Sequence, residues 1–582
     1  MTTRAAHTSV RSSVSVAIPS IRRRAKALSL VCCLVSGCGT TQPPRPTPLP
    51  QPAASEAREG LSAELSGLNT RARAGAVTEI IGGERVDDPY RALEQTTPDT
   101  EAWLAAQTAR TEQALAKLRD PEAEARLKRL LEIGTLGEVE IAGKRVFFTL
   151  REAPRERPAL YMLDTTAPIP AASELRAATP LIDPQTFGAR AALDYMVPAR
   201  AGRYVAFGIS DNGDERATLR VYDVEQKRLL PDEIAHAKWS AVEWLNDDSG
   251  FYYRRYPKPG EARWNESEPD SYDAQLFVHR LGQPVDSDVL VFKGDKPVDF
   301  PAATLDDTGR YLLITNQRTW TASDVWLWDR GATASKRGFV PPADKLVPIL
   351  RDTDKLANGV IVGGQLYLTT NLDAPKQRII KVDAAHAADR AHWKVIVPES
   401  DATIESALVT QHFIVVHSIR HVQSRLELYD HEGAALGELV LPDIGSVAEL
   451  SGAIEHDRIV FTWSSFLNAP QLFACDLTTR KLENLYQVEQ DFRAQDYELK
   501  QVSVPSTDGT AINVFYTQKR GIVRDGKTPV LVYGYGGFDV SLLPSFSRSA
   551  LYFLEQGGIY AQANLRGGGE FGESWHRAGM LK

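Results

Sequence analysis

The sequence has 582 residues and an ordinary globular composition, with 43% hydrophobic and 24% charged residues, 41 Gly and 34 Pro. This composition excludes a protein that is mainly disordered, collagen-like or coiled-coil, and the length allows about three or four domains. The formal net charge is −8, and the first 37 residues hold six cations and no acid, so the remainder carries −14. Because phosphate contacts need clustered cations, this acidic body argues against nucleic-acid binding.

Residues 1–37 are expected to be an export signal. A cationic cluster at Arg22–Lys26 precedes an apolar run from Ala27 to Val35, which is too short for a permanent membrane span. The end of this leader, up to Cys38, resembles the lipobox of bacterial lipoproteins, in which the cysteine is lipidated and becomes the mature N-terminus. Cys38 is therefore the predicted lipidation site, and the protein is expected to be lipid-anchored on the periplasmic side of a bacterial membrane. A plain secretory signal cut nearby is the alternative.

Residues 38–78 are predicted to be a Pro-rich linker, because six prolines between Pro43 and Pro52 favour extended polyproline II. The lipid is the only membrane contact expected, since no later segment has the ~18 consecutive apolar residues of a transmembrane helix. After the leader only Cys38 and Cys475 remain, so no disulfide framework is possible. Cys475 is expected to be a buried thiol.

Residues 79–135 are predicted to be an N-terminal helical segment. The helical pattern runs from about 98 to 132, where Thr97 can cap the helix and Pro98 suits its first position. One helix face would carry Leu104, Leu115 and Leu118.

Between residues 136 and 490 the hydrophobic period changes from 3.6 to 2, and a pair of strand-like runs repeats seven times. The second run of each pair usually ends in aspartate, and the mean period between Asp164 and Asp476 is 52 residues. The first runs begin at Arg145, Arg203, Gly250, Arg310, Gln365, Phe413 and Arg458, and the second runs end at Asp164, Asp223, Arg280, Asp329, Asp383, Asp430 and Asp476.

This repeat predicts an all-β, seven-bladed β-propeller. A lone four-stranded sheet leaves both faces wet, whereas radial stacking buries each face against a neighbouring blade. The repeat length is close to the ~40–50 residues of propeller blades. A pair of β-sandwiches with chance spacing is the alternative. The repeated aspartates are expected to be turn formers that accept hydrogen bonds from local backbone amides, rather than calcium ligands.

Residues 491–582 have an α/β character. Asp508-Gly509 lies between two β-like runs and predicts a hairpin. Residues 529–533 form an apolar run that suits a strand buried on both faces, and a glycine-dense loop follows it. A helix ending at Gly557-Gly558 and a further strand running into glycines come next. This order is typical of the beginning of an α/β domain.

Three segments carry a resemblance to a known family: DDPYRALEQTTPDTEAWLAAQ from Asp87, PVLVYGYGGFD from Pro529, and GGIYAQANLRGGGEFGESWH from Gly557. They resemble the prolyl oligopeptidase family of serine peptidases. The resemblance implies a seven-bladed propeller coupled to an α/β-hydrolase domain, of which 491–582 would be the incomplete beginning. It also implies cleavage of short peptides on the carboxyl side of proline, with proline-containing peptides as partners, no cofactor and a monomeric protein.

The resemblance also assigns roles to two aromatic residues. Tyr535 matches the family tyrosine whose hydroxyl helps to form the oxyanion hole, and Phe538 matches a residue that lines the proline pocket. The alternative for each is an aromatic packed beside a glycine turn. Asn564, Arg566 and Glu570 lie in the matched Gly-rich motif, and a loop-holding salt bridge is the expected use of Arg566.

The catalytic serine, aspartate and histidine of the family are absent from this sequence. The family nucleophile lies in a Gly-x-Ser-x-Gly turn, and no such pentapeptide occurs here. The nearest imitation surrounds Ser574 and lacks the closing glycine. One hypothesis is therefore a truncated, inactive form of an exported prolyl peptidase, and the other is a non-catalytic, membrane-tethered propeller that binds peptides.

No metal site is expected from the sequence. His412, His417 and His421 cluster in the chain, but they lack a Cys or acidic partner at ligand spacing, so a solvated strand face is predicted.

Overall fold

The computed structural model describes residues 67–70, 72–165, 174, 178–331, 338–523 and 525–580. These residues form two compact units, which are treated separately: one extends to Lys128 and the other starts at Arg129. The predicted export signal, Cys38 and the prolines of the predicted linker lie outside the described residues. Within the described ranges, no helix combines the length and the apolar character needed to cross a bilayer.

The first unit contains a hairpin and helices. Residues 67–70 are helical and strand β1 begins at Val77, so the stretch assigned to the linker includes regular secondary structure. Leu68 and Ala72 of this helical stretch are buried. The elements are β1 (Val77–Ile81), β2 (Glu84–Asp88), the 3-10 helix η1 (Arg91–Glu94), α2 (Pro98–Ala116) and α3 (Pro121–Glu132), which continues into the second unit.

The predicted cap is confirmed, since the Thr97 hydroxyl accepts a hydrogen bond from the Thr100 amide. The helical run predicted from 98 to 132 is, however, two helices. Because Pro121 has no amide hydrogen, it cannot continue the first helix, and it begins α3 instead. Leu118 lies beyond the end of α2, and the predicted face that carries Leu104 and Leu115 is exposed.

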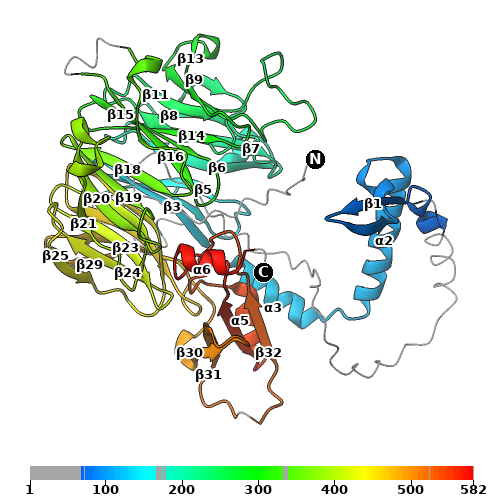
Figure 1. The fold of residues 1–582 in the computed structure, drawn as a ribbon. Coiled ribbons are helices and arrows are strands. Elements are labelled where there is room, and N and C mark those ends of the chain that lie inside the picture. Colours follow the sequence, from blue (N-terminus) through cyan, green and yellow to red (C-terminus); the bar gives the residue numbers. More distant parts are fainter. Residues whose placement is uncertain are drawn as a thin grey trace. The chain divides into compact units, whose positions relative to one another are not determined.

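In the described part of the second unit, seven antiparallel sheets follow one another in chain order, coloured from cyan to yellow in Figure 1. The first three sheets are β3 (Thr135–Ala142), β4 (Arg145–Arg151) and β5 (Ala159–Asp164); β6 (Ala191–Pro198), β7 (Tyr204–Asp211), β8 (Thr218–Asp223) and β9 (Arg228–Ile234); and β10 (Glu243–Trp244), β11 (Gly250–Arg255), β12 (Gln275–Arg280) and β13 (Val289–Lys293).

The next four sheets each have four strands. They are β14 (Phe300–Leu305), β15 (Tyr311–Gln317), β16 (Ser323–Asp329) and β17 (Val347–Leu350); β18 (Ala357–Val362), β19 (Gln365–Thr370), β20 (Arg378–Asp383) and β21 (Lys394–Val397); β22 (Thr403–Val409), β23 (Ile414–Arg420), β24 (Gln423–Tyr429) and β25 (Ala435–Leu439); and β26 (Ser446–Gly452), β27 (Arg458–Ser464), β28 (Gln471–Asp476) and β29 (Lys481–Gln487). Short 3-10 helices η2 (Pro184–Phe187), η3 (Val285–Ser287), η5 (Ala343–Lys345), η6 (Ala384–His386), η7 (Arg390–His392) and η8 (Ala494–Asp496) lie in the connections.

The seven repeated pairs of the sequence are the second and third strands of the seven sheets, so the propeller prediction is confirmed. The first and last sheets are in contact, since the Ile141 amide donates to the Ser451 hydroxyl over 3.1 Å and that hydroxyl donates to Glu140 over 3.0 Å. The predicted turn role of the aspartates is also confirmed. Asp223, for example, accepts hydrogen bonds from two local backbone amides.

The last segment forms a mixed sheet of order β30-β31-β33-β32, drawn in orange to red in Figure 1. The hairpin predicted at Asp508-Gly509 is confirmed by the antiparallel pairing of its first two strands. The elements are β30 (Tyr497–Pro505), β31 (Ala511–Lys519), β32 (Val530–Gly534), α5 (Arg548–Glu555), β33 (Ile559–Asn564) and α6 (Glu573–Ala578). The expectation of a strand buried on both faces at 529–533 is wrong. All residues of β32 are exposed, because no described element covers its two faces; among the described residues it is an edge strand that pairs only with β33.

The α/β segment and the propeller share one hydrophobic core. Phe515 of β31 and Tyr560 of β33 contact Phe466, which follows strand β27 of the last sheet, with ring centroids 5.7 and 5.9 Å apart. Leu551 of α5 belongs to the same buried cluster. The two parts are therefore expected to unfold together.

Replacing Phe515 with alanine tests this shared core. The ring is fully buried, so Phe515→Ala should lower the free energy of unfolding by about 3–5 kcal/mol. Val523→Ala is the matched control, because Val523 is 78% exposed and should change stability little. Urea unfolding monitored by tryptophan fluorescence measures both, and equal midpoints for the two variants would contradict the assignment.

A buried histidine joins the second and third sheets. His279 of β12 lies between Asp232, 2.9 Å from its Nε2, and Asp288, 2.7 Å from its Nδ1. Burial alone lowers the pKa of His279, but hydrogen bonds to the two carboxylates outweigh that effect and raise the pKa to about 9. The folded protein therefore holds this proton over a pH range in which an unfolded chain has lost it.

The raised pKa of His279 predicts how stability depends on pH. Its contribution is complete below pH ~6.5 and is lost as the pH rises towards 9, because the unfolded chain binds fewer protons there. The loss should reach at most about 3 kcal/mol. His279→Gln should flatten this part of the stability profile. Urea unfolding at several pH values measures it, and an unchanged slope in the variant would count against the assignment.

Candidate functional site

Two glycine-dense loops follow the parallel strands β32 and β33. The first Gly-rich loop is residues 535–541, and the second Gly-rich loop is residues 565–572. Because neighbouring parallel strands end at the same edge of a sheet, the two loops meet there. Such an edge is where open α/β sheets bind ligands.

The two loops approach each other more closely than side chains would allow. A Cβ atom on Gly567 would lie 2.3 Å from the Gly536 carbonyl oxygen, and the backbone of Gly567 has a φ of +100°. The Asp539 amide donates to the Gly567 carbonyl over 3.1 Å, and the Gly567 amide donates to the Trp575 carbonyl over 3.0 Å. The glycines therefore permit a backbone contact that fixes one loop against the other.

The first Gly-rich loop presents both predicted aromatic residues to solvent. Tyr535 is 40% exposed, and among the described residues no hydrogen bond engages its hydroxyl. Partial burial raises the pKa of Tyr535, so the hydroxyl stays protonated and can donate. Phe538 is 56% exposed and has a φ of +55°, which is rare for a bulky residue. Strained positions of this kind concentrate at functional sites.

Phe538 also contacts the propeller. Its ring lies edge-on to Trp320, with centroids 6.0 Å apart and an angle of 64° between the planes. Trp320 lies in the connection between β15 and β16, so two distant chain segments form one aromatic surface. Sequence reasoning missed Trp320, because nothing in the local pattern of that turn marks it.

The other residues of the Gly-rich motif hold the loops together. Asn564 donates to Glu570 over 3.0 Å and to the Leu542 carbonyl over 2.8 Å. Arg566 pairs with Asp508 of the β30–β31 turn, which confirms the predicted salt bridge. Glu570 is 2% exposed and also accepts from the Leu542 amide over 3.0 Å.

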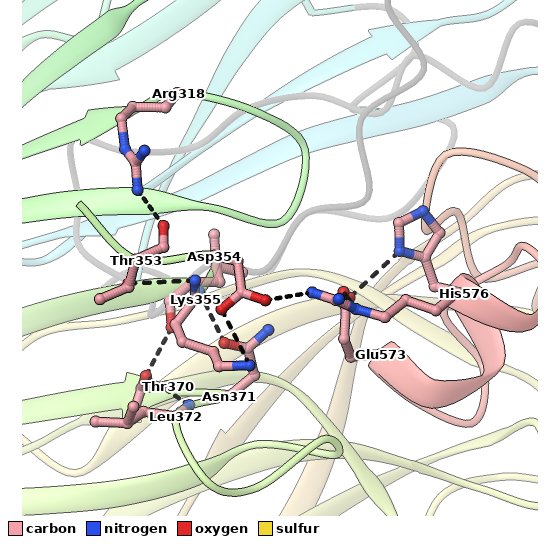
Figure 2. Close-up of polar contacts among 11 residues, drawn as sticks. Arg318, Thr353, Asp354, Lys355, Thr370, Asn371, Leu372, Glu573 and His576 are labelled. Atoms are coloured by element: carbon pink, nitrogen blue, oxygen red, sulfur yellow. Dashed lines mark hydrogen bonds and ion pairs between the residues drawn. The ribbon is translucent and has the colours of Figure 1, made fainter. Parts of the chain in front are cut away.

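Helix α6 contacts the propeller. The Glu573 amide donates to the Pro375 carbonyl over 2.9 Å, and Arg577 donates to Asp354 over 2.8 Å and to Glu573 over 2.6 Å. Figure 2 shows Asp354, in the loop before β18, facing Glu573 and His576 of this helix. The contact joins the second Gly-rich loop to the fifth sheet of the propeller.

Ser574 has no catalytic surroundings. Its residue is exposed on α6, and the neighbouring His576 is buried, with Nδ1 3.3 Å from the Glu573 carboxylate. Hydrogen bonding to Glu573 raises the pKa of His576. Glu573 and His576 therefore form an ion pair within one helix.

Cys475 and the three clustered histidines lie in or beside propeller strands. Cys475 is buried as predicted, and burial raises the pKa of its thiol to about 11. His412 is exposed and pairs with Asp457 over 2.6 Å. The predicted solvated face is wrong for His417, which is buried and hydrogen-bonded to Ser424, because it alternates to the inner face of β23.

A carboxylate of the propeller reaches the first Gly-rich loop. Glu405 occupies a β-bulge of β22, between the paired residues Ile404 and Ser406, and accepts from the Ser541 hydroxyl over 3.2 Å. Burial raises the pKa of Glu405 to about 8, and the charges of Asp539 and Glu570 add to this rise. Sequence reasoning did not single out Glu405 or Asp539.

The propeller, the α/β segment and the paired Gly-rich loops define a class: a peptidase-type α/β-hydrolase segment carried on a seven-bladed β-propeller. A family model described as "Prolyl oligopeptidase, N-terminal beta-propeller domain" matches residues 70–488, and one described as "Prolyl oligopeptidase family" matches residues 544–582. The chain therefore belongs to the prolyl oligopeptidase family of serine peptidases.

Known proteins agree with this assignment. A prolyl endopeptidase from Elizabethkingia meningoseptica is 28% identical over 510 residues, which cover 86% of this chain and 69% of that protein. Prolyl oligopeptidase A from Galerina marginata is 29% identical over 532 residues, with 86% and 70% covered. A solved structure from a study of two prolyl endopeptidases superposes with a TM-score of 0.77 at 28% identity and covers 87% of this chain and 72% of that one.

The contact between the loops can be tested with two glycine substitutions. Gly567→Ala forces a side chain against the Gly536 carbonyl, whereas Gly521→Ala has a similar positive φ but no atom within 4 Å. The backbone penalty of about 1–2 kcal/mol is common to both. Gly567→Ala should lose a further ~1–3 kcal/mol through overpacking. Urea unfolding measures the difference, and equal losses would contradict the close approach.

Proposed function

We propose that this chain binds short proline-containing peptides at the first Gly-rich loop, in the manner of a prolyl oligopeptidase, and that the 582 residues do not hydrolyse them. The observation that carries this proposal is the exposed pair of Tyr535 and Phe538 in a chain that belongs to this family. The aromatic surface formed by Phe538 and Trp320 would bury a pyrrolidine ring.

Tyr535 would act in the transition state rather than in peptide binding. Its free hydroxyl can donate to an oxyanion that develops on the scissile carbonyl, and loss of such a donor typically costs ~2.7–4 kcal/mol. That role requires a nucleophile, and this sequence contains no Gly-x-Ser-x-Gly turn. The chain therefore keeps the binding surface and one oxyanion donor without an activated serine.

Peptide binding and hydrolysis can be measured separately on the purified chain. Fluorescence anisotropy with a labelled proline-containing peptide should show saturable binding that weakens about tenfold or more in Phe538→Ala, because the apolar wall is lost. Tyr535→Phe should bind as wild type does, since its donor acts only in the transition state. The same peptide with alanine in place of proline is the specificity control.

A fluorophosphonate probe tests the missing nucleophile. We expect no labelling of the chain and no cleavage of a prolyl amide. Labelling, or turnover that persists in Ser574→Ala, would refute the claim that the chain has no activated serine. Equal binding of the proline and alanine peptides would instead refute the binding proposal.

A membrane-tethered peptide-binding propeller is the second candidate, and the leader sequence favours it. We propose lipidation at Cys38, because the residues before it resemble a lipobox, and hence a periplasmic location. Expression in a bacterium with labelled palmitate should label the chain and place it in the membrane fraction. Cys38→Ser should remove both the label and the membrane association, and label retained by that variant would exclude the anchor.

A further inference from the structure

Three metal-ligating side chains meet where the first Gly-rich loop contacts α6. Donor atoms of Asp539, Glu573 and His576 all lie within 4.8 Å of one another. Glu573 and His576 stand at positions i and i+3 of α6, a spacing that helical metal sites use to place both side chains on one side. Figure 2 shows these two side chains pointing toward one another.

The distance between the Glu573 and His576 donor atoms suits two ligands of one shared metal ion. Glu573 Oε2 and His576 Nδ1 are 3.3 Å apart. Two ligand atoms that are each about 2.1 Å from a tetrahedral Zn²⁺ lie about 3.4 Å apart. Arg577 is bonded to the other oxygen, Glu573 Oε1, and so leaves Oε2 facing the histidine. The carboxylate of Asp539 has no side-chain hydrogen bond within the described chain and is available as a third ligand.

A buried carboxylate oxygen beside this cluster also lacks a partner. Glu570 is 2% exposed, and its Oε1 is occupied by the Leu542 amide and Asn564. Its Oε2 has no hydrogen-bond partner among the residues that the structure describes. A Cβ atom built on Gly568 would lie within 3 Å of both Glu570 Oε2 and the Val540 carbonyl oxygen. Glu570 Oε2 therefore faces the backbone next to Asp539.

Four carboxyl groups lie near one another at this junction, those of Glu405, Asp539, Glu570 and Glu573. Arg577 and His576 contact Glu573. Desolvated carboxylates are costly unless a proton, a cation or hydrogen bonds compensate them. A bound divalent cation is one such compensation.

We propose that Asp539, Glu573 and His576 bind a divalent transition-metal ion, for which Zn²⁺ is the best match, with Glu570 as the adjacent acceptor. An imidazole nitrogen with two carboxylate oxygens is a ligand set of Zn²⁺ and Mn²⁺, whereas Ca²⁺ prefers oxygen ligands alone. The ion would tie Asp539, and hence the loop of Tyr535 and Phe538, to α6. This site is structural and takes no part in peptide hydrolysis.

Isothermal titration of the purified, chelator-treated chain with Zn²⁺ tests the site directly, without any peptide. We expect one ion per chain, with Mn²⁺ weaker and Ca²⁺ not detected. Asp539→Asn and His576→Gln should each weaken Zn²⁺ binding at least about tenfold. Thermal unfolding should rise with Zn²⁺ in the wild type and should not rise in either variant.

Two controls keep this result specific to the proposed site. His386 and His392 form an exposed stacked pair, with ring centroids 4.8 Å apart, and are the competing place for adventitious Zn²⁺. The double variant His386→Gln/His392→Gln should bind as wild type does. Asp539→Asn keeps the test valid if His576→Gln fails to fold. The absence of 1:1 binding, loss of binding in the His386/His392 variant, or wild-type affinity in Asp539→Asn would overturn the proposal.

Discussion

Burial of both faces of each small sheet is the constraint on which the rest of this structure depends. A sheet of three or four strands cannot form a core alone, so each sheet packs against the next one along the chain. One core cluster, for example, combines Leu313 and Leu327 of the fourth sheet with Leu366 and Leu368 of the fifth. Because the sheet faces are buried in this way, only strand ends and connections remain to form a site.

The α/β segment depends on the same constraint. It has a single mixed sheet, and it buries one side by joining the core of the first and last propeller sheets. Arg548 of α5 reinforces this attachment, because its guanidinium donates to the Ile133 carbonyl over 2.8 Å. The Gly-rich loops are thereby held against propeller connections, and that placement brings Trp320 to Phe538. The aromatic surface exists only when both parts are folded.

The sequence predicted the features that repeat or that carry a long motif. Seven strand pairs are visible in the sequence because each pair has a period of two and all but the third, which ends at Arg280, end in an aspartate. The contacts that depend on single residues could not be predicted from the sequence. Trp320 and Asp354 matter through contacts with residues more than 200 positions away, and Glu405 is redirected by a bulge that no local pattern announces. The exposure of β32 depends on which elements cover its two faces, and composition does not encode that.

The junction of the two parts combines close packing with several neighbouring carboxyl groups. Hydrophobic residues in place of Glu405 or Asp539 would avoid the desolvation cost of these carboxylates, so their presence is not explained by stability. Asp539 directly follows Phe538, and its amide is bonded to the second Gly-rich loop. Any proton or cation that neutralises Asp539 therefore acts on the loop that carries both aromatic residues. Electrostatics at this junction and the position of the peptide-binding surface are thus physically coupled, although the charged groups and the aromatic surface are distinct.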